Sequence, residues 1–195
     1  GIRREISLHL PKPDIRVLLL MFTAFSIGFM GGIMQEYAFM FLREVYGFTE
    51  GGVSWIYTYG SLGGALMGLM LAYIADRKGE EIVLALFLPL MVASSLYLSA
   101  GSLLLLVALA AFTVISLLRG FRGILRSLAK VYMNDYVGTG VGAVNTFSDI
   151  GSIVSPPIAG YLYDVYPNSG MPYVISAILL FLALLLWITP FRKTK

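Results

Sequence analysis

The stretch Ala72-Tyr73-Ile74-Ala75-Asp76-Arg77-Lys78-Gly79 decides the fold, because a long apolar run ends there in a short charged turn. Apolar runs at residues 53–74 and 82–99 lie on either side of the turn. A helix needs about 20 residues, at 1.5 Å per residue, to cross a hydrocarbon core of roughly 30 Å. The stretch therefore indicates a surface turn between two membrane-spanning helices, with Gly79 allowing the chain to reverse.

Four further apolar segments, at residues 17–42, 103–130, 140–162 and 172–190, have similar lengths. The 195-residue chain is 58% hydrophobic and 13% charged, whereas soluble domains are about 45–50% apolar and about 25% charged. The runs lack the alternation of barrel strands, so helices are expected. We predict an all-α membrane protein with a polar leader at 1–16, a six-helix transmembrane bundle at 17–191 and a tail at 192–195.

Basic residues predict the orientation of the bundle. Only Arg43 falls on one side of the predicted membrane. By the positive-inside rule, the other side is cytoplasmic and both termini lie there, in an integral protein of the inner or plasma membrane. The basic residues on that side are Arg3, Arg4, Lys12, Arg16, Arg77, Lys78, Lys130, Arg192, Lys193 and Lys195.

A short internal repeat relates the second and fifth predicted helices. Gly60-Ser61 in one corresponds to Gly151-Ser152 in the other, and each helix ends in a Tyr-containing run closed by Asp, at Asp76 and Asp164. The two helices hold the same place in successive triplets, and three crossings give the triplets opposite topology. This pattern predicts two inverted three-helix repeats, with chance similarity as the alternative.

The turn resembles the signature of the major facilitator superfamily, whose secondary transporters have twelve helices in two six-helix halves. Asp76, Arg77 and Gly79 match that signature, while Ala72 replaces a usual glycine and Glu80-Glu81 replace two basic residues.

Two other segments resemble motifs of the same family. The run Arg119-Gly120-Phe121-Arg122-Gly123 is similar to an Arg-x-x-x-Gly motif of the fourth helix of a half. The run 151–160 is similar to the Gly-Pro-x-x-Gly pattern of the eleventh helix, with Ser155 in place of the glycine before proline.

This resemblance implies the C-terminal half of a major-facilitator bundle. The chain would form half of a secondary active transporter that moves a small solute by alternating access. Its partner would be an N-terminal six-helix half or a second copy, and its surroundings a lipid bilayer. The start at Gly1 and the linker-like leader agree with a longer chain. Asp76, Arg77 and Gly79 would latch one state; alternatively, Arg77 and Lys78 only set topology.

Polar residues inside the predicted helices suggest a solute or proton pathway, because ionisable groups there cost about 2.5–3.5 kcal/mol each on insertion scales. Arg119, Arg122 and Arg126 share one face of their helix, opposite a polar stripe. We expect Asp149 or Glu36 to exchange a proton while Arg119 or Arg122 neutralises it or contacts an anionic group. A static ion pair is the alternative. The candidate pathway residues are Glu36, Tyr37, Arg119, Arg122, Asn145 and Asp149.

Helix breaks are expected at Gly31-Gly32 and at Pro156-Pro157, where a kink could gate the path. Ordinary packing is the alternative, because membrane helices tolerate both residue types.

Several classes of function do not fit the sequence. There is no cysteine, and the single histidine, His9, lies in the leader, so we expect no metal site, no cofactor and no intramembrane protease. Basic residues lie at segment ends rather than in one patch, so no nucleic-acid partner is expected. A channel would favour a repeated filter segment. A non-transporting six-helix scaffold stays open.

Overall fold

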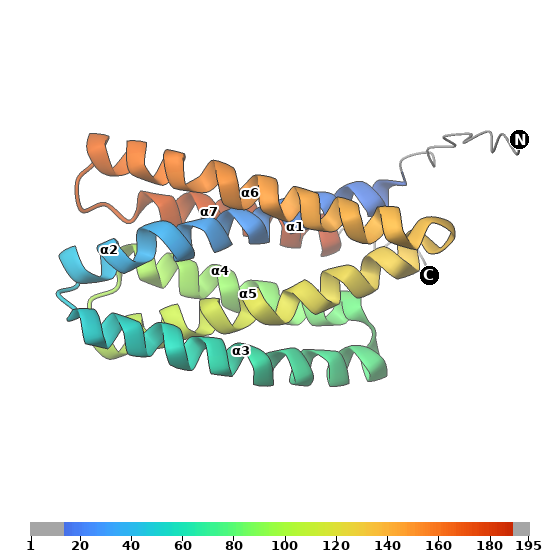
Figure 1. Ribbon diagram of the computed structural model, residues 1–195, viewed down its shortest axis with the longest axis horizontal. Coiled ribbons are helices and arrows are strands. Elements are labelled where there is room, and N and C mark those ends of the chain that lie inside the picture. Colours follow the sequence, from blue (N-terminus) through green and yellow to red (C-terminus); the bar gives the residue numbers. More distant parts are fainter. Residues whose placement is uncertain (1–13, 189–195) are drawn as a thin grey trace, which may run out of the picture.

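The computed structural model describes residues 14–188, in which every regular element is helical (Figure 1). A π-helical turn η1 (Ile33–Tyr37) joins α1 (Ile15–Gly32) to α2 (Ala38–Glu44), so these three form one continuous span. A 3-10 turn η2 (Asn134–Tyr136) connects α5 to α6. The other helices are α3 (Glu50–Lys78), α4 (Glu80–Ala100), α5 (Leu104–Tyr132), α6 (Val137–Val165) and α7 (Met171–Ile188).

The helices lie side by side along the long axis of the molecule (Figure 1). We call the end that holds Ile15, Gly79, η2 and Ile188 the inner end, and the opposite end the outer end. Of the predicted leader and tail, the structure describes residues 14–16. Asp14 caps the first turn of α1 by accepting the Arg16 N–H at 3.1 Å. Residue 190, where the sixth segment was predicted to end, is outside the described residues.

Five spans in the described part of the chain are long and apolar enough to cross a membrane. The predicted fifth segment, α6, is as long as α3 and α5 at 29 residues but is not among the five. It is rich in Gly, Ser and Pro and carries Asp149 within the helix. These residues lower its hydropathy below that of its neighbours, which is expected of a helix that lines a polar cavity.

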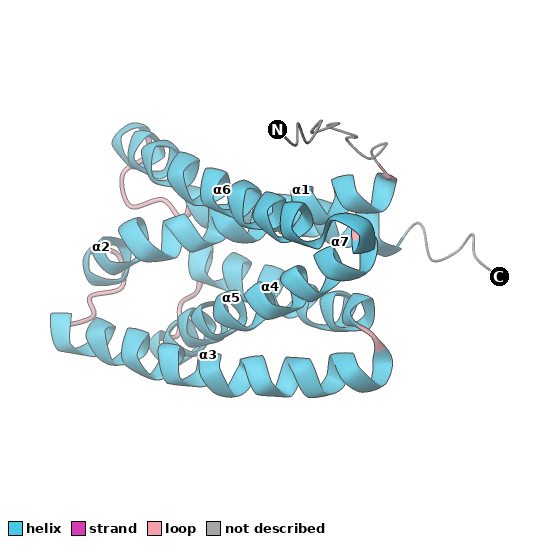
Figure 2. Cartoon of the chain, turned by 45° about the vertical axis from the view of Figure 1, so that its right-hand side comes forward, coloured by secondary structure: helices cyan, strands magenta, loops and turns pink. Residues whose placement is uncertain are grey.

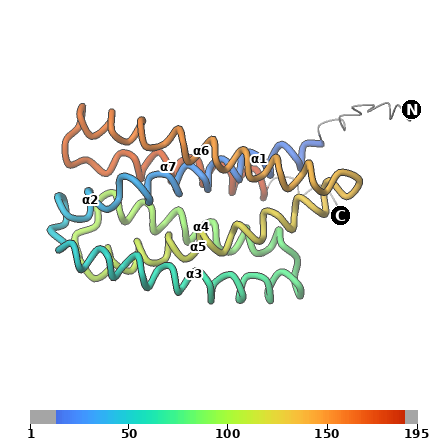
Figure 3. The backbone as a smooth tube through the Cα atoms, viewed as in Figure 1, coloured from blue at the N-terminus to red at the C-terminus, as the bar shows by residue number. Residues whose placement is uncertain are grey.

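The predicted two inverted three-helix repeats are confirmed by the packing. The first repeat is α1–α2, α3 and α4, and the second is α5, α6 and α7. The most extensive contacts pair α1 with α6 and α5 with α3, which are equivalent pairs when the repeats are exchanged. The contact between α4 and α7 is its own equivalent. Helices α1, α6 and α7 thus form one group and α3, α4 and α5 the other, as Figures 2 and 3 show.

Glycines bring the paired helices close together, with backbone against backbone between α1 and α6 and with α5 side chains against α3 glycines between α3 and α5. A Cβ atom added to Gly28 of α1 would lie 2.0 Å from the Ser148 carbonyl oxygen of α6, and one added to Gly151 would lie 2.3 Å from the Phe25 carbonyl oxygen. In the other pair, Gly60 of α3 contacts Ile115 of α5. Small residues of this kind permit close helix approach where lipid offers no hydrophobic driving force.

The inner end is held by contacts between helices of both repeats. Gly79 adopts φ 92° and ψ 150°, a conformation that favours glycine, and separates α3 from α4. Ser127 of α5 donates to Glu80 at 2.6 Å, and Tyr132 donates to Glu81. The two acidic residues that depart from the expected basic pair thus fasten the start of α4 to α5.

We predict that Gly28→Ala destabilises the protein, whereas Gly142→Ala does not. The new methyl group at Gly28 would overlap the α6 backbone, while the one at Gly142 meets nothing within 4 Å. Overpacking of this kind typically costs about 1–3 kcal/mol. Thermal unfolding in detergent compares the two variants. Equal midpoints for both would contradict the close α1–α6 contact.

Candidate functional site

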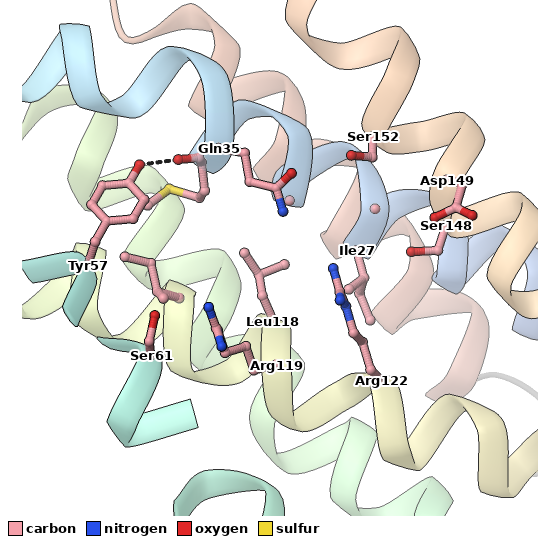
Figure 4. Close-up of a pocket in the computed structure, with 14 residues that line it drawn as sticks. Ile27, Gln35, Tyr57, Ser61, Leu118, Arg119, Arg122, Ser148, Asp149 and Ser152 are labelled. Atoms are coloured by element: carbon pink, nitrogen blue, oxygen red, sulfur yellow. Dashed lines mark hydrogen bonds between the residues drawn. The ribbon is translucent and has the colours of Figure 1, made fainter. Parts of the chain in front are cut away.

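A π-helical turn interrupts the first span directly after Gly31-Gly32. The Ala38 N–H donates to the Ile33 carbonyl, five residues back, and the Tyr57 hydroxyl of α3 donates to the Met34 carbonyl (Figure 4). Such turns occur frequently at functional sites. The interruption therefore follows the glycines named as a helix break, and Tyr57 supplies a donor at that position.

A central cavity of about 360 Å³ lies between the two helix groups. Its wall includes Gly31 and Gln35 from the first span, Tyr57 and Ser61 from α3, Arg119 and Arg122 from α5, and Ser148, Asp149 and Ser152 from α6. Figure 4 shows the two arginines on one side and Gln35, Asp149 and Ser152 on the other. The cavity therefore combines charges of both signs with neutral hydrogen-bonding groups.

The recurring glycine-serine pair accounts for two of the hydroxyl groups in the cavity wall. Gly60 and Gly151 each contact the partner helix, and the next residue, Ser61 or Ser152, lines the cavity. At the interface of the repeats, a Cβ added to Gly31 would lie 3.9 Å from a Leu118 methyl group. The cavity is thus shared by both repeats, but among the described residues its charged side chains come from α5 and α6 of the second.

The side chain of Arg119 packs against Gly64 of α3. Its aliphatic stem packs so closely on Gly64 that a Cβ added there would lie 2.7 Å from Cδ and 2.8 Å from Cβ of Arg119. No ion pair joins Asp149 to Arg119 or Arg122 in residues 14–188, where Arg43–Glu50 at 3.0 Å is the salt bridge found. Both arginines and Asp149 are exposed in this chain. Their side chains are therefore not buried by the rest of the described chain.

Asn145 belongs to a second cavity of about 230 Å³, adjoining the first on its inner side. Arg126 Nε donates to Asn145 Oδ1 at 3.1 Å, which links α5 to α6. Arg122, Ser148 and Asp149 line both cavities.

Glu36 and Tyr37 are not among the residues that line these two cavities. Glu36 is exposed on η1, and Tyr37 is 4% exposed in an aromatic cluster near the outer end, with Phe41 and Tyr173. The Tyr37 hydroxyl donates to the Ser169 carbonyl at 3.2 Å. The structure thus brings together four of the six predicted pathway residues.

Both prolines lie inside α6, which continues from Val137 to Val165. Pro156 has no N–H to donate to the Ser152 carbonyl, four residues back, so the regular helical hydrogen bond is missing there. That carbonyl accepts the Ser155 hydroxyl at 3.4 Å, and it would lie 2.3 Å from a Cβ added to Gly32. The proline site in α6 and the glycine site in α1 therefore meet at one crossing.

Asp76 of the charged turn lines a third cavity, of about 250 Å³, together with Glu80 and Ser127. The Arg77 guanidinium carbon lies 4.5 Å from the centre of the Tyr73 ring, a cation–π contact. No group of three or more His, Cys, Asp or Glu residues that could hold a metal ion occurs within residues 14–188.

Comparison with known proteins agrees with this geometry. A family model described as Major Facilitator Superfamily matches residues 14–195. The chain belongs to the Major Facilitator Superfamily. One similar relative, from Thermus thermophilus, is named a probable nitrate/nitrite antiporter NarK1 and is 30% identical over 206 residues. The match covers 100% of this chain and 46% of the relative, so the chain spans about half the length of the relative.

Sequence reasoning did not name Gln35, Ser61 or Ser148 as site residues. For Ser61 a signal existed, because it follows the glycine of the repeat just as Ser152 does. Gln35 reaches the wall from the π-helical turn, and no sequence pattern had predicted this turn.

We predict that Tyr57→Phe lowers the free energy of unfolding by about 1 kcal/mol, the usual worth of one hydrogen bond. The change removes the donor to the Met34 carbonyl and keeps the ring. Tyr59→Phe is the matched control, because Tyr59 is 55% exposed. The free energy of unfolding is measured in detergent for both variants. If Tyr57→Phe unfolds with the same free energy as the parent protein, this hydrogen bond does not stabilise the turn.

Proposed function

We propose that the chain is half of a secondary active transporter that moves a small solute by alternating access. One observation supports this most: a charged cavity lies about midway along the helices, where two inverted repeats meet. Binding sites at the interface of repeats, reached in turn from each side by rocking, are a general arrangement in transporters.

The charges favour a solute with an anionic group, either a simple anion or a zwitterion. Arg119 and Arg122 face the cavity, and Asp149 is the carboxylate that the described residues contribute to its wall. Guanidinium groups present paired donors that fit carboxylate and other oxyanions. Because the relative from Thermus thermophilus is named for nitrate and nitrite, these are the first anions to assay.

We further propose that a proton is coupled to transport through Asp149. Protonation would remove the negative charge opposite Arg122, so binding of the solute anion and binding of a proton would support each other. Glu36 is exposed on the π-helical turn and is the second candidate.

The remaining parts of the chain fit this function. Asp76, Arg77 and Gly79 would hold one state at the inner end, which we assign to the cytoplasm because Arg77, Lys78 and Lys130 lie there. Gly31-Gly32 and Pro156-Pro157, which meet at one crossing, would permit the helices to adjust. The partner would cover the exposed apolar side chains of α3 and α6, such as Leu66 and Ile153. It is an N-terminal half or a second copy.

We predict that Asp149→Asn abolishes the pH dependence of transport and slows uptake at least about tenfold, which is typical of a lost proton-transfer group. The assay is uptake of labelled nitrate by the full native chain in proteoliposomes, with and without a pH gradient. Asp164→Asn, at the exposed outer end of α6, is the matched control and should behave as the parent protein.

Two results would count against these proposals. If Asp149→Asn kept both the uptake and its pH dependence, the coupling role would be wrong. If the parent protein moved no anion or zwitterion in a panel extended from nitrate to acetate and glycine, a non-transporting scaffold would be favoured.

A further inference from the structure

Three arginines lie in sequence along the cavity face of α5. Arg119, Arg122 and Arg126 are spaced i, i+3 and i+7, so they share one face of the helix and span about 10 Å at 1.5 Å per residue. All three side chains are exposed in the described part of the chain. They therefore form a line of positive charge from the middle of the bundle toward its inner end.

The two cavities along this line adjoin each other and share lining residues. Arg119 lines the central cavity of about 360 Å³, Arg126 lines the inner cavity of about 230 Å³, and Arg122 lines both. Ser148 and Asp149 of α6 are also shared. A small solute that leaves the central cavity toward the inner end would thus stay in contact with Arg122.

Each cavity carries the same charge balance. Within the described chain, each cavity is lined by three charged residues: two arginines and the carboxylate of Asp149. At the inner cavity, Arg126 uses its Nε–H to bind Asn145, and the terminal N–H groups of its guanidinium are further donors. Asn145 is therefore suited to hold Arg126 against α6 while Arg126 binds an anionic group.

We propose that the inner cavity is a second anion-binding station, formed by Arg122, Arg126 and Asn145. An anionic group would pass between this station and the central one through the shared Arg122. The inference rests on the proposed transport function, since a path has meaning only for a moving solute. It adds a site and a sequence of contacts to that function.

The test uses a cysteine-free background of the full native chain, and the 195 residues of this sequence already lack cysteine. A single Ser61→Cys change places a thiol in the central cavity only, and a single Ser148→Cys change places one in both. In the full native chain, the reaction rates of a negatively charged sulfonatoethyl methanethiosulfonate and a positively charged trimethylammonioethyl methanethiosulfonate are compared, each relative to its rate with free 2-mercaptoethanol. We expect the anionic reagent to be favoured about tenfold at both positions, because two arginines against one carboxylate give each wall a net positive charge, which raises the local concentration of anions.

Charge removal then separates the two stations. Arg126→Gln should lower the preference for the anionic reagent several-fold at Ser148→Cys and much less at Ser61→Cys, while Arg119→Gln should do the opposite. Arg43→Gln is the matched control, because Arg43 pairs with Glu50 in the outer part of the molecule, and it should change neither preference. Arg126→Lys should retain the preference and provides a second variant in case Arg126→Gln fails to fold.

Equal rates for the two reagents at both positions would overturn the proposal, and so would an Arg126→Gln variant with an unchanged preference at Ser148→Cys. Failure of the transport function gives a different pattern: the parent protein would not accumulate any solute, while the preference and its dependence on Arg126 would remain. That pattern would support the second anion station and reject only the transport proposal.

Discussion

Close helix packing at glycine is the constraint on which the rest of the structure depends. Backbone lies against backbone between α1 and α6, and α5 side chains lie against the α3 glycines between α3 and α5. In lipid, apolar side chains gain little by leaving one apolar surface for another, so helices associate through close packing and interhelical hydrogen bonds. Gly28 and Gly151 bring α1 onto α6, and Gly60 and Gly64 bring α3 onto α5. Because each pair joins one helix of each repeat, these contacts also bind the two repeats together.

The same contacts position the polar groups. Ser61 and Ser152 follow the packed glycines and face the central cavity, and the stem of Arg119 lies in the space that Gly64 leaves. Charged groups at membrane depth are costly, and here they gather where solute or water can reach them. The π-helical turn adds Gln35 to the same wall. The packing thereby produces a polar cavity on the axis of an otherwise apolar bundle.

The fold could be predicted from the sequence because its signals are local or periodic: long apolar runs, a charged turn at Gly79 and a glycine-serine pair that recurs. Family membership followed from the same turn and is confirmed. The site could be predicted only in part. Arg119, Arg122 and Asp149 were recognisable as charges within apolar segments, whereas Tyr37 carries the same polar signal and lies in a buried aromatic cluster. The direction of a side chain depends on helix packing and, for Gln35, on a π-helical turn, which no sequence pattern had predicted.

The central claim is that one cavity opens alternately to the two sides of the membrane. The most direct measurement places a single thiol at Ser152, in the wall of that cavity, and labels the full native chain in sealed vesicles with a membrane-impermeant maleimide from each side separately. Our account predicts labelling from both sides, with saturating solute on one side changing the balance between them. Labelling from one side only, whatever the solute gradient, would contradict it.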